Sequence, residues 1–166
     1  MSDKVEIKQK IVEMVQEAET LIPAVMEPDL PPQLMGGKEL LPGIPARHEY
    51  ESMVWDLGEK IRQLIKSCPA LQNDEELYSK FLPICLNRNA KRGRQSFIML
   101  FGYKRFTIYA KDLATQIDDT FVEGHIIDVI LKMKAPGYEN MMEHYVNHKN
   151  TWMRNTAKMY LAKAPY

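Results

Sequence analysis

The sequence predicts an all-α domain in which two longer helices precede about three stacked helical hairpins. Apolar residues recur at steps of three and four over most of the chain, which is the period of a helix with one buried face. No segment shows the sustained period-two alternation of β-branched residues that is typical of a sheet strand. The segment KMKAPGY at 132–138 returns as LAKAPY at 161–166, which indicates an internal repeat.

The first 73 residues are expected to form two helices separated by a loop. Apolar residues line one helical face in residues 1–22, and Pro23 ends the pattern. Six prolines and three glycines exclude regular structure from residues 23–47, so we expect a long loop that lies against the surface. The segment 48–73 contains the second helix, and Pro69 is its stop signal.

Residues 74–166 are expected to form the hairpins. The periodicity predicts helices at 74–86, 91–103, 105–117, 121–134, 138–148 and 151–163. A shift of 31 places Gly93 on Gly124, a shift of 30 places Gly124 on Arg154, and the apolar positions stay apolar. The repeating unit is therefore about thirty residues long, and a hairpin of this kind buries its apolar face by stacking on the next one.

Two segments of this region resemble the second half of a HEAT repeat. In YVNHKNTWMRNTAKMYL (145–161), an apolar-Arg pair at 153–154 precedes the small residue Ala157 and the apolar Leu161, and FLPICLNRNAKRGRQSFIMLFG (81–102) is similar. The middle copy departs from the pattern with Glu123 or Gly124 at the arginine position, and the first copy has Ser96 or Gln95 at the small position. The resemblance covers 74–166 and implies an α-solenoid that presents a concave binding surface, but it implies no reaction.

Composition limits the functional classes. The 166 residues are 45% hydrophobic, which is enough for one domain without disulfide or metal staples. The chain has 22 basic and 22 acidic residues, so its overall charge gives no argument for nucleic acid or an anionic membrane. Residues 1–60 have a net charge of −6, from six bases and twelve acids, and residues 61–166 have +6, from sixteen bases and ten acids. The two parts are therefore expected to attract each other.

Cysteine usage and hydropathy favour a soluble, cytoplasmic protein. Cys68 and Cys85 have no CxxC spacing, and no apolar segment near the N-terminus has the pattern of a secretory signal. No uninterrupted apolar stretch approaches the roughly 20 residues that cross a bilayer. We expect reduced cysteines and no membrane partner.

The expected function is that of a non-enzymatic protein-interaction module or scaffold. The terminal repeat of a solenoid exposes an apolar face unless a further element caps it, and methionine and aromatic side chains suit adaptable binding surfaces. The candidate binding residues are Trp152, Met153, Arg154 and Tyr160. The partner is a second copy or a different protein, and the alternative for each residue is packing in the core.

Nucleic-acid binding is the alternative function. Seven cations meet no acid before Asp112: Arg88, Lys91, Arg92, Arg94, Lys104, Arg105 and Lys111. Interleaved aromatic residues could stack on bases, although they also have the spacing of packed helices. The cations could instead be solvated or pair with the acidic N-terminal part. Trp152 and Arg154, with Asp118 and Asp119 one repeat earlier, also resemble residues of HEAT-like DNA glycosylases, which is an analogy of fold alone.

No residue pattern predicts catalysis, a cofactor or a metal. His144 and His148 are four residues apart, and His125 could approach them from the preceding hairpin. The segment is not HExxH and supplies no carboxylate base, so we expect ordinary histidines and no metal site. Ser, Cys and His form no nucleophile with a local base, and the glycines form neither a phosphate loop nor a dinucleotide fingerprint.

Overall fold

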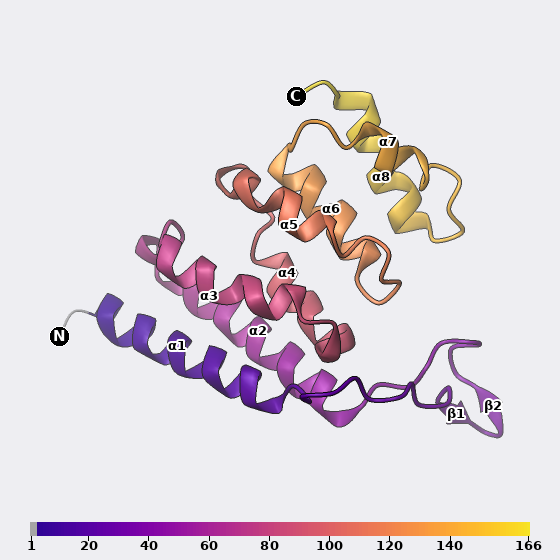
Figure 1. The fold of residues 1–166 in the computed structure, drawn as a ribbon, viewed down its shortest axis with the longest axis horizontal. Helices are drawn as coiled ribbons and strands as arrows, with labels where there is room; N and C mark the ends of the chain where they lie inside the picture. Colours follow the sequence, from indigo (N-terminus) through magenta and orange to yellow (C-terminus); the bar gives the residue numbers. More distant parts are fainter. Residues whose placement is uncertain (1–2) are drawn as a thin grey trace.

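The computed structural model describes residues 3–166, and these are mostly helical (Figure 1). The α-helices are α1 (Asp3–Leu21), α2 (Glu49–Ser67), α3 (Glu75–Leu86), α4 (Gln95–Met99), α5 (Ala110–Ala114), α6 (Glu123–Met133), α7 (Glu139–Glu143) and α8 (Thr151–Lys163). Three 3₁₀ segments, η1 (Pro69–Leu71), η2 (Arg88–Arg94) and η3 (Lys104–Tyr109), connect them. None of the helices described in residues 3–166 is long and apolar enough to span a bilayer.

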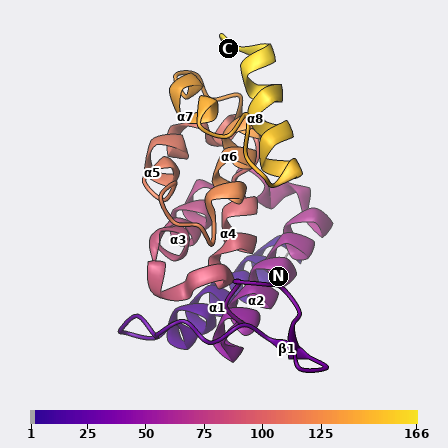
Figure 2. The same ribbon diagram turned by 90° about the vertical axis from the view of Figure 1, so that its right-hand side faces the viewer.

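The helices pack in an alternating order along the chain. Helix α2 contacts α4, α4 contacts α6, and α6 contacts α8, while α1 contacts α3 and α3 contacts α5. Neighbours in the sequence also pair, as α1 with α2, α3 with α4 and α7 with α8. Figure 2 shows the N-terminal pair at one end of the molecule and α7 with α8 at the other. One hydrophobic core runs between these elements from Ile11 in α1 to Tyr160 in α8.

Helices α1, α2, α3, α6 and α8 agree with the predicted segments, whereas three other predicted helices are shorter. The segment 91–103 begins as η2 and becomes α-helical only from Gln95, because Lys91 has a positive φ of 48° that interrupts a helix. The segment 105–117 is η3 followed by α5, and α7 covers only part of 138–148. In η3, the Thr107 hydroxyl lies 2.6 Å from the Lys104 carbonyl oxygen and 3.1 Å from that of Met133, and such bonds compete with the α-helical pattern.

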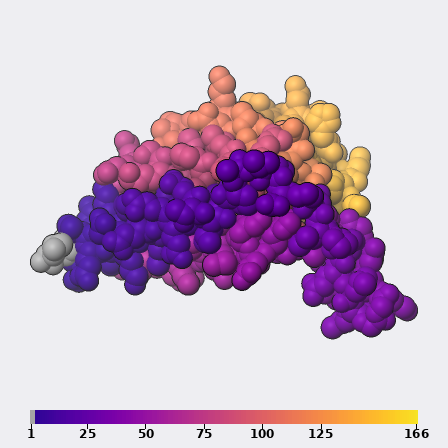
Figure 3. Space-filling model, turned by 60° about the horizontal axis from the view of Figure 1, so that its bottom comes forward, coloured from indigo at the N-terminus to yellow at the C-terminus, as the bar shows by residue number. Residues whose placement is uncertain are grey.

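Residues 30–44, here called the arm, form a hairpin that leaves the helical body. Strands β1 (Leu34–Met35) and β2 (Lys38–Glu39) pair antiparallel around Gly36 and Gly37, whose φ values of 59° and 77° suit a tight hairpin turn. The expectation that the whole segment 23–47 lies against the surface is wrong for the arm. Figures 1 and 3 show it projecting from the body, because its two-residue strands have no element facing them.

Candidate functional site

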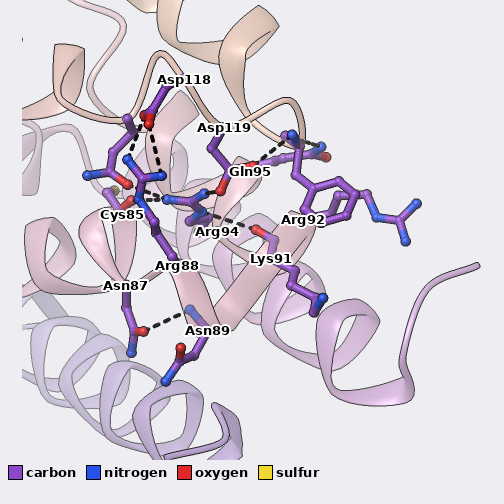
Figure 4. A network of polar contacts seen from close by, with 12 residues as sticks. Cys85, Asn87, Arg88, Asn89, Lys91, Arg92, Arg94, Gln95, Asp118 and Asp119 are labelled. Atoms are coloured by element: carbon purple, nitrogen blue, oxygen red, sulfur yellow. Dashed lines mark hydrogen bonds and ion pairs between the residues drawn. The ribbon is translucent and has the colours of Figure 1, made fainter. Parts of the chain in front are cut away.

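Four of the seven predicted basic residues are held by carboxylates, and for two of them this is the pairing with the acidic N-terminal part that the sequence left as an alternative. The Arg88 guanidinium lies 2.6 Å from Asp118, and the Lys91 ammonium lies 2.5 Å from Asp29. The pairing with the acidic N-terminal part therefore occurs for Lys91, and also for Arg92, whose Nε lies 3.1 Å from the buried Glu51 carboxylate. Figure 4 shows Arg88, Lys91 and Arg92 around η2, with Asp118 beside Arg88.

Arg94 is the central member of this network. Its side chain is 0% exposed, and it donates hydrogen bonds to the carbonyl oxygens of Lys91 and Cys85 at 3.2 and 3.3 Å. It also donates to the Gln116 side chain at 2.8 Å and pairs with Asp119. Burial lowers the pKa of the guanidinium and Asp119 opposes that shift. Arg94 therefore joins η2 to the region before α6 and is not accessible to a ligand.

The other three predicted cations lie on or just after η3. Lys104, Arg105 and Lys111 are exposed, and they form no ion pair within residues 3–166. The Arg105 guanidinium lies over the Tyr103 ring, 4.4 Å from its centroid. Of the aromatic residues that alternate with the cations, Phe97, Phe101 and Phe106 are buried and Tyr109 is half-buried, so only Tyr103 is widely exposed. The basic surface is therefore smaller than the sequence predicted.

The four predicted C-terminal binding residues separate into core and surface. Met153 and Tyr160 are buried, and the Tyr160 hydroxyl lies 2.5 Å from the Ala135 carbonyl oxygen. Arg154 is half-buried and donates to the His148 carbonyl oxygen at 2.9 Å. Trp152 is 44% exposed, with its ring against that of His125 at a centroid distance of 5.2 Å. Only Trp152 of the four is widely exposed.

Helix α8 also presents Met159, which the sequence reading did not select as a site residue although it is 49% exposed. Met159 and Trp152 are seven residues apart, which is the spacing of one helical face and a signal that the sequence contained. Between α6 and α8 lies a cavity of about 440 Å³, here called the C-terminal groove. Its lining includes Leu131, Trp152, Met159 and Tyr166, with a polar part formed by Asp128, Lys132, Lys134, Asn155, Thr156 and Lys163.

The histidines and the glycosylase-like residues do not form a chemical centre. Within residues 3–166, no group of three or more His, Cys, Asp or Glu residues is placed to hold a metal ion. Burial lowers the pKa of His125 to about 4, which favours its neutral form. Asp118 and Asp119 are bound by Arg88 and Arg94, whereas Arg154 bonds to its own turn.

Comparisons with protein-family models, with curated proteins and with solved structures found no match to this chain.

Proposed function

We propose that this chain is a non-enzymatic protein-interaction module, and the observation that carries the proposal is the apolar arm. Six of its large apolar side chains are between 37% and 70% exposed: Leu30, Leu34, Met35, Leu40, Leu41 and Ile44. Exposed apolar side chains that gather in one short hairpin, rather than lying singly over a surface, suit an interaction site, and a two-stranded ribbon alone is marginally stable in water. The arm therefore gains stability when another surface covers it.

Hydrogen bonds within the hairpin hold the two sides of the arm together. The Leu40 N–H donates to the Gln33 carbonyl oxygen at 2.7 Å, and the Gly43 N–H donates to the Glu39 carboxylate at 2.9 Å. A further backbone bond of 3.2 Å joins Ala46 to Pro31 at the base. Preordering lowers the entropic cost of association, because less freedom is lost on binding.

The occupant that we propose for the arm is the C-terminal groove of a second copy. The groove offers the exposed Trp152 and Met159, and its lining holds three lysines against Asp128 alone. The arm holds one base, Lys38, and one acid, Glu39, so it has no net charge and the proposed contact rests on apolar surface alone. Figure 2 shows the arm and α8 at opposite ends of the molecule, so the contact is between copies. A reciprocal exchange of arms closes into a two-fold dimer.

The scaffold of this module is proposed to be a short HEAT-like superhelix. The alternating contacts support it, because α2, α4, α6 and α8 pack in succession while α1 and α3 lie beside them. The ion pair between Arg88 and Asp118 joins residues thirty positions apart, which is the length of the predicted unit. In this interpretation α1 and α2 are a further hairpin before the three of residues 74–166.

Solution mass, measured by light scattering over a range of concentrations, tests the proposed exchange. Wild type is expected to be dimeric. Two variants are expected to be monomeric: the arm double variant Leu34→Ser/Met35→Ser and the groove variant Met159→Ser. Ile108→Ser is the matched control, because Ile108 is 76% exposed and lies outside both surfaces. A wild type that stays monomeric at every concentration, or a control that dissociates like the arm variant, would overturn the exchange.

Nucleic-acid binding through η3 is a second candidate function. The observation in its favour is that Lys104, Arg105 and Lys111 are exposed without a carboxylate partner in residues 3–166, beside the exposed ring of Tyr103. Three phosphate contacts to single-stranded nucleic acid give a slope of log K against log salt of about −2. A titration of a labelled single-stranded oligonucleotide at several salt concentrations measures that slope, and a slope near zero rejects this candidate.

A further inference from the structure

A cavity of about 250 Å³, here called the η3 pocket, opens between α2, η1, α3, α4 and η3. Its lining consists of Arg62, Ile65, Lys66, Gln72, Tyr78, Met99, Leu100, Tyr103 and Arg105. The volume is slightly below the range of about 300–1,000 Å³ that is usual for small-molecule sites. The pocket is therefore better suited to a small organic ligand than to a single ion.

The lining contains three cations and no carboxylate. The Arg62 guanidinium is engaged by Glu59, with an ion-pair distance of 2.8 Å, so its charge is balanced. Lys66 and Arg105 have no carboxylate within ion-pair distance in the part of the chain that the structure describes. Counting Glu59, the charge around the pocket is +2, and this excess is concentrated on Lys66 and Arg105.

Arg105 is fixed in position before any ligand arrives. Its Nε donates to the Gln72 carbonyl oxygen at 2.9 Å, and its guanidinium lies 4.4 Å from the Tyr103 ring centroid and 4.9 Å from that of Phe106. No carboxylate of residues 3–166 lies within ion-pair distance of this guanidinium. A guanidinium held in this way forms paired hydrogen bonds to an oxyanion with little loss of side-chain freedom.

Tyr78 supplies a hydroxyl at the same place. The residue is 1% exposed and lines the pocket, with its ring stacked on Phe106 at a centroid distance of 3.9 Å. Burial raises the pKa of Tyr78 to about 12, and the neighbouring Arg105 opposes that rise. The hydroxyl therefore keeps its proton at neutral pH and can donate it in a hydrogen bond.

We propose that the η3 pocket binds a small phosphate monoester, with Arg105 and Lys66 on the phosphate and Ile65, Met99 and Leu100 against its organic part. A phosphate monoester carries a charge of about −1.5 to −2 at pH 7, which balances the +2 around the pocket, whereas a carboxylate balances only half of it. This site is independent of the arm and of the C-terminal groove.

Isothermal titration calorimetry of the full chain with phenyl phosphate tests the site, and inorganic phosphate and benzoate serve as comparison probes. Phenyl phosphate is expected to bind more tightly than either, because it alone combines a dianion with an apolar ring. Loss of one charged hydrogen bond in Arg105→Gln is expected to weaken binding by about 10- to 100-fold. Tyr78→Phe removes only the hydroxyl and is expected to weaken binding by a smaller factor, about 2- to 10-fold.

Lys111→Gln is the matched control, because Lys111 is exposed and does not line the pocket. Its affinity for phenyl phosphate is expected to equal that of wild type, and thermal melts of every variant establish that each is folded. Three outcomes overturn the proposal. The first is that wild type binds none of the probes. The second is that Lys111→Gln and Arg105→Gln weaken binding alike, which would indicate diffuse attraction of anions. The third is that a single-stranded oligonucleotide binds while phenyl phosphate does not, which would favour the nucleic-acid candidate.

Discussion

Replacement of Arg94 by methionine is expected to lower the free energy of unfolding by about 3–5 kcal/mol, because it breaks a buried ion pair and leaves one charge without its partner. Arg94 is fully buried and binds two backbone carbonyls, Gln116 and Asp119. In a chain of this size each 1 kcal/mol shifts Tm by about 2–4 °C, so Tm is expected to fall by about 6–20 °C. Urea unfolding followed by circular dichroism measures the free energy directly.

Two further variants test whether the loss of stability in Arg94→Met comes from the broken ion pair. Arg94→Met with Asp119→Leu is expected to recover most of the loss, because apolar groups can replace a buried pair at little cost. Recovery stays incomplete by about 1 kcal/mol, since Asp119 also accepts from the Phe121 N–H at 2.9 Å. Lys111→Met, on an exposed residue, is expected to change stability by less than about 0.5 kcal/mol. A loss below about 1 kcal/mol for Arg94→Met alone would refute the structural role given to Arg94.

Three other outcomes are expected from the packing and from one pKa. Ala157 is fully buried in α8, so Ala157→Leu is expected to cost about 1–3 kcal/mol through overpacking, and an unchanged Tm would show that the repeat register is wrong. A Cβ on Gly58 would lie 2.8 Å from that of Ser96 on α4. Gly58→Ala is therefore expected to lower the free energy of unfolding, measured in urea, by a similar amount. The double variant Gly58→Ala/Ser96→Gly is expected to lose less stability than Gly58→Ala alone. Burial lowers the pKa of His125 to about 4 in the folded protein. As the pH falls, the unfolded chain therefore binds a proton at this histidine before the folded chain does. The free energy of unfolding is expected to fall between about pH 6.5 and 4, by at most about 3 kcal/mol. His125→Asn should show a smaller fall than wild type over that range, and an identical fall would assign the pH dependence to other groups.

The long helices could be predicted from the sequence because each carries enough periodic apolar residues to define a buried face. Helix α2 is an example, with Leu57, Ile61 and Ile65 buried at steps of four, although Met53, which has the same spacing, is 42% exposed. The short elements could not be predicted in the same way. In η2 the backbone follows the buried ion pairs and the positive φ of Lys91, and neither has a periodic signal.

The basic cluster shows why charge patterns along a sequence do not identify a binding surface. Lys91 and its partner Asp29 are 62 residues apart, and Arg92 and Glu51 are 41 apart. The sequence could indicate only that the acidic and basic parts attract each other. Five ion pairs join residues 1–60 to residues 61–166, and three of them have the expected polarity: Lys91 with Asp29, Arg92 with Glu51 and, within α2, Arg62 with Glu59. The other two have the reverse polarity, because Lys8 from the acidic part binds Asp74 and Glu76. Local charge counting fails because the acids that neutralise a cation are selected by the fold.

The three cations of the cluster that form no ion pair within residues 3–166, Lys104, Arg105 and Lys111, lie in exposed segments, whereas most of the paired ones are buried. Lys91, Arg92 and Arg94 in η2 are buried, so leaving one of them without a carboxylate would cost several kcal/mol, and each has a partner. Arg88 is partly exposed, and its pair with Asp118 contributes little. An exposed cation on or just after η3 keeps its hydration, so the absence of a carboxylate partner costs little stability. Arg105 differs from Lys104 and Lys111, because two aromatic rings and a backbone carbonyl fix it beside a cavity. Stability alone does not require that arrangement at an exposed position, and it is therefore the feature of the basic cluster that points most directly to a ligand.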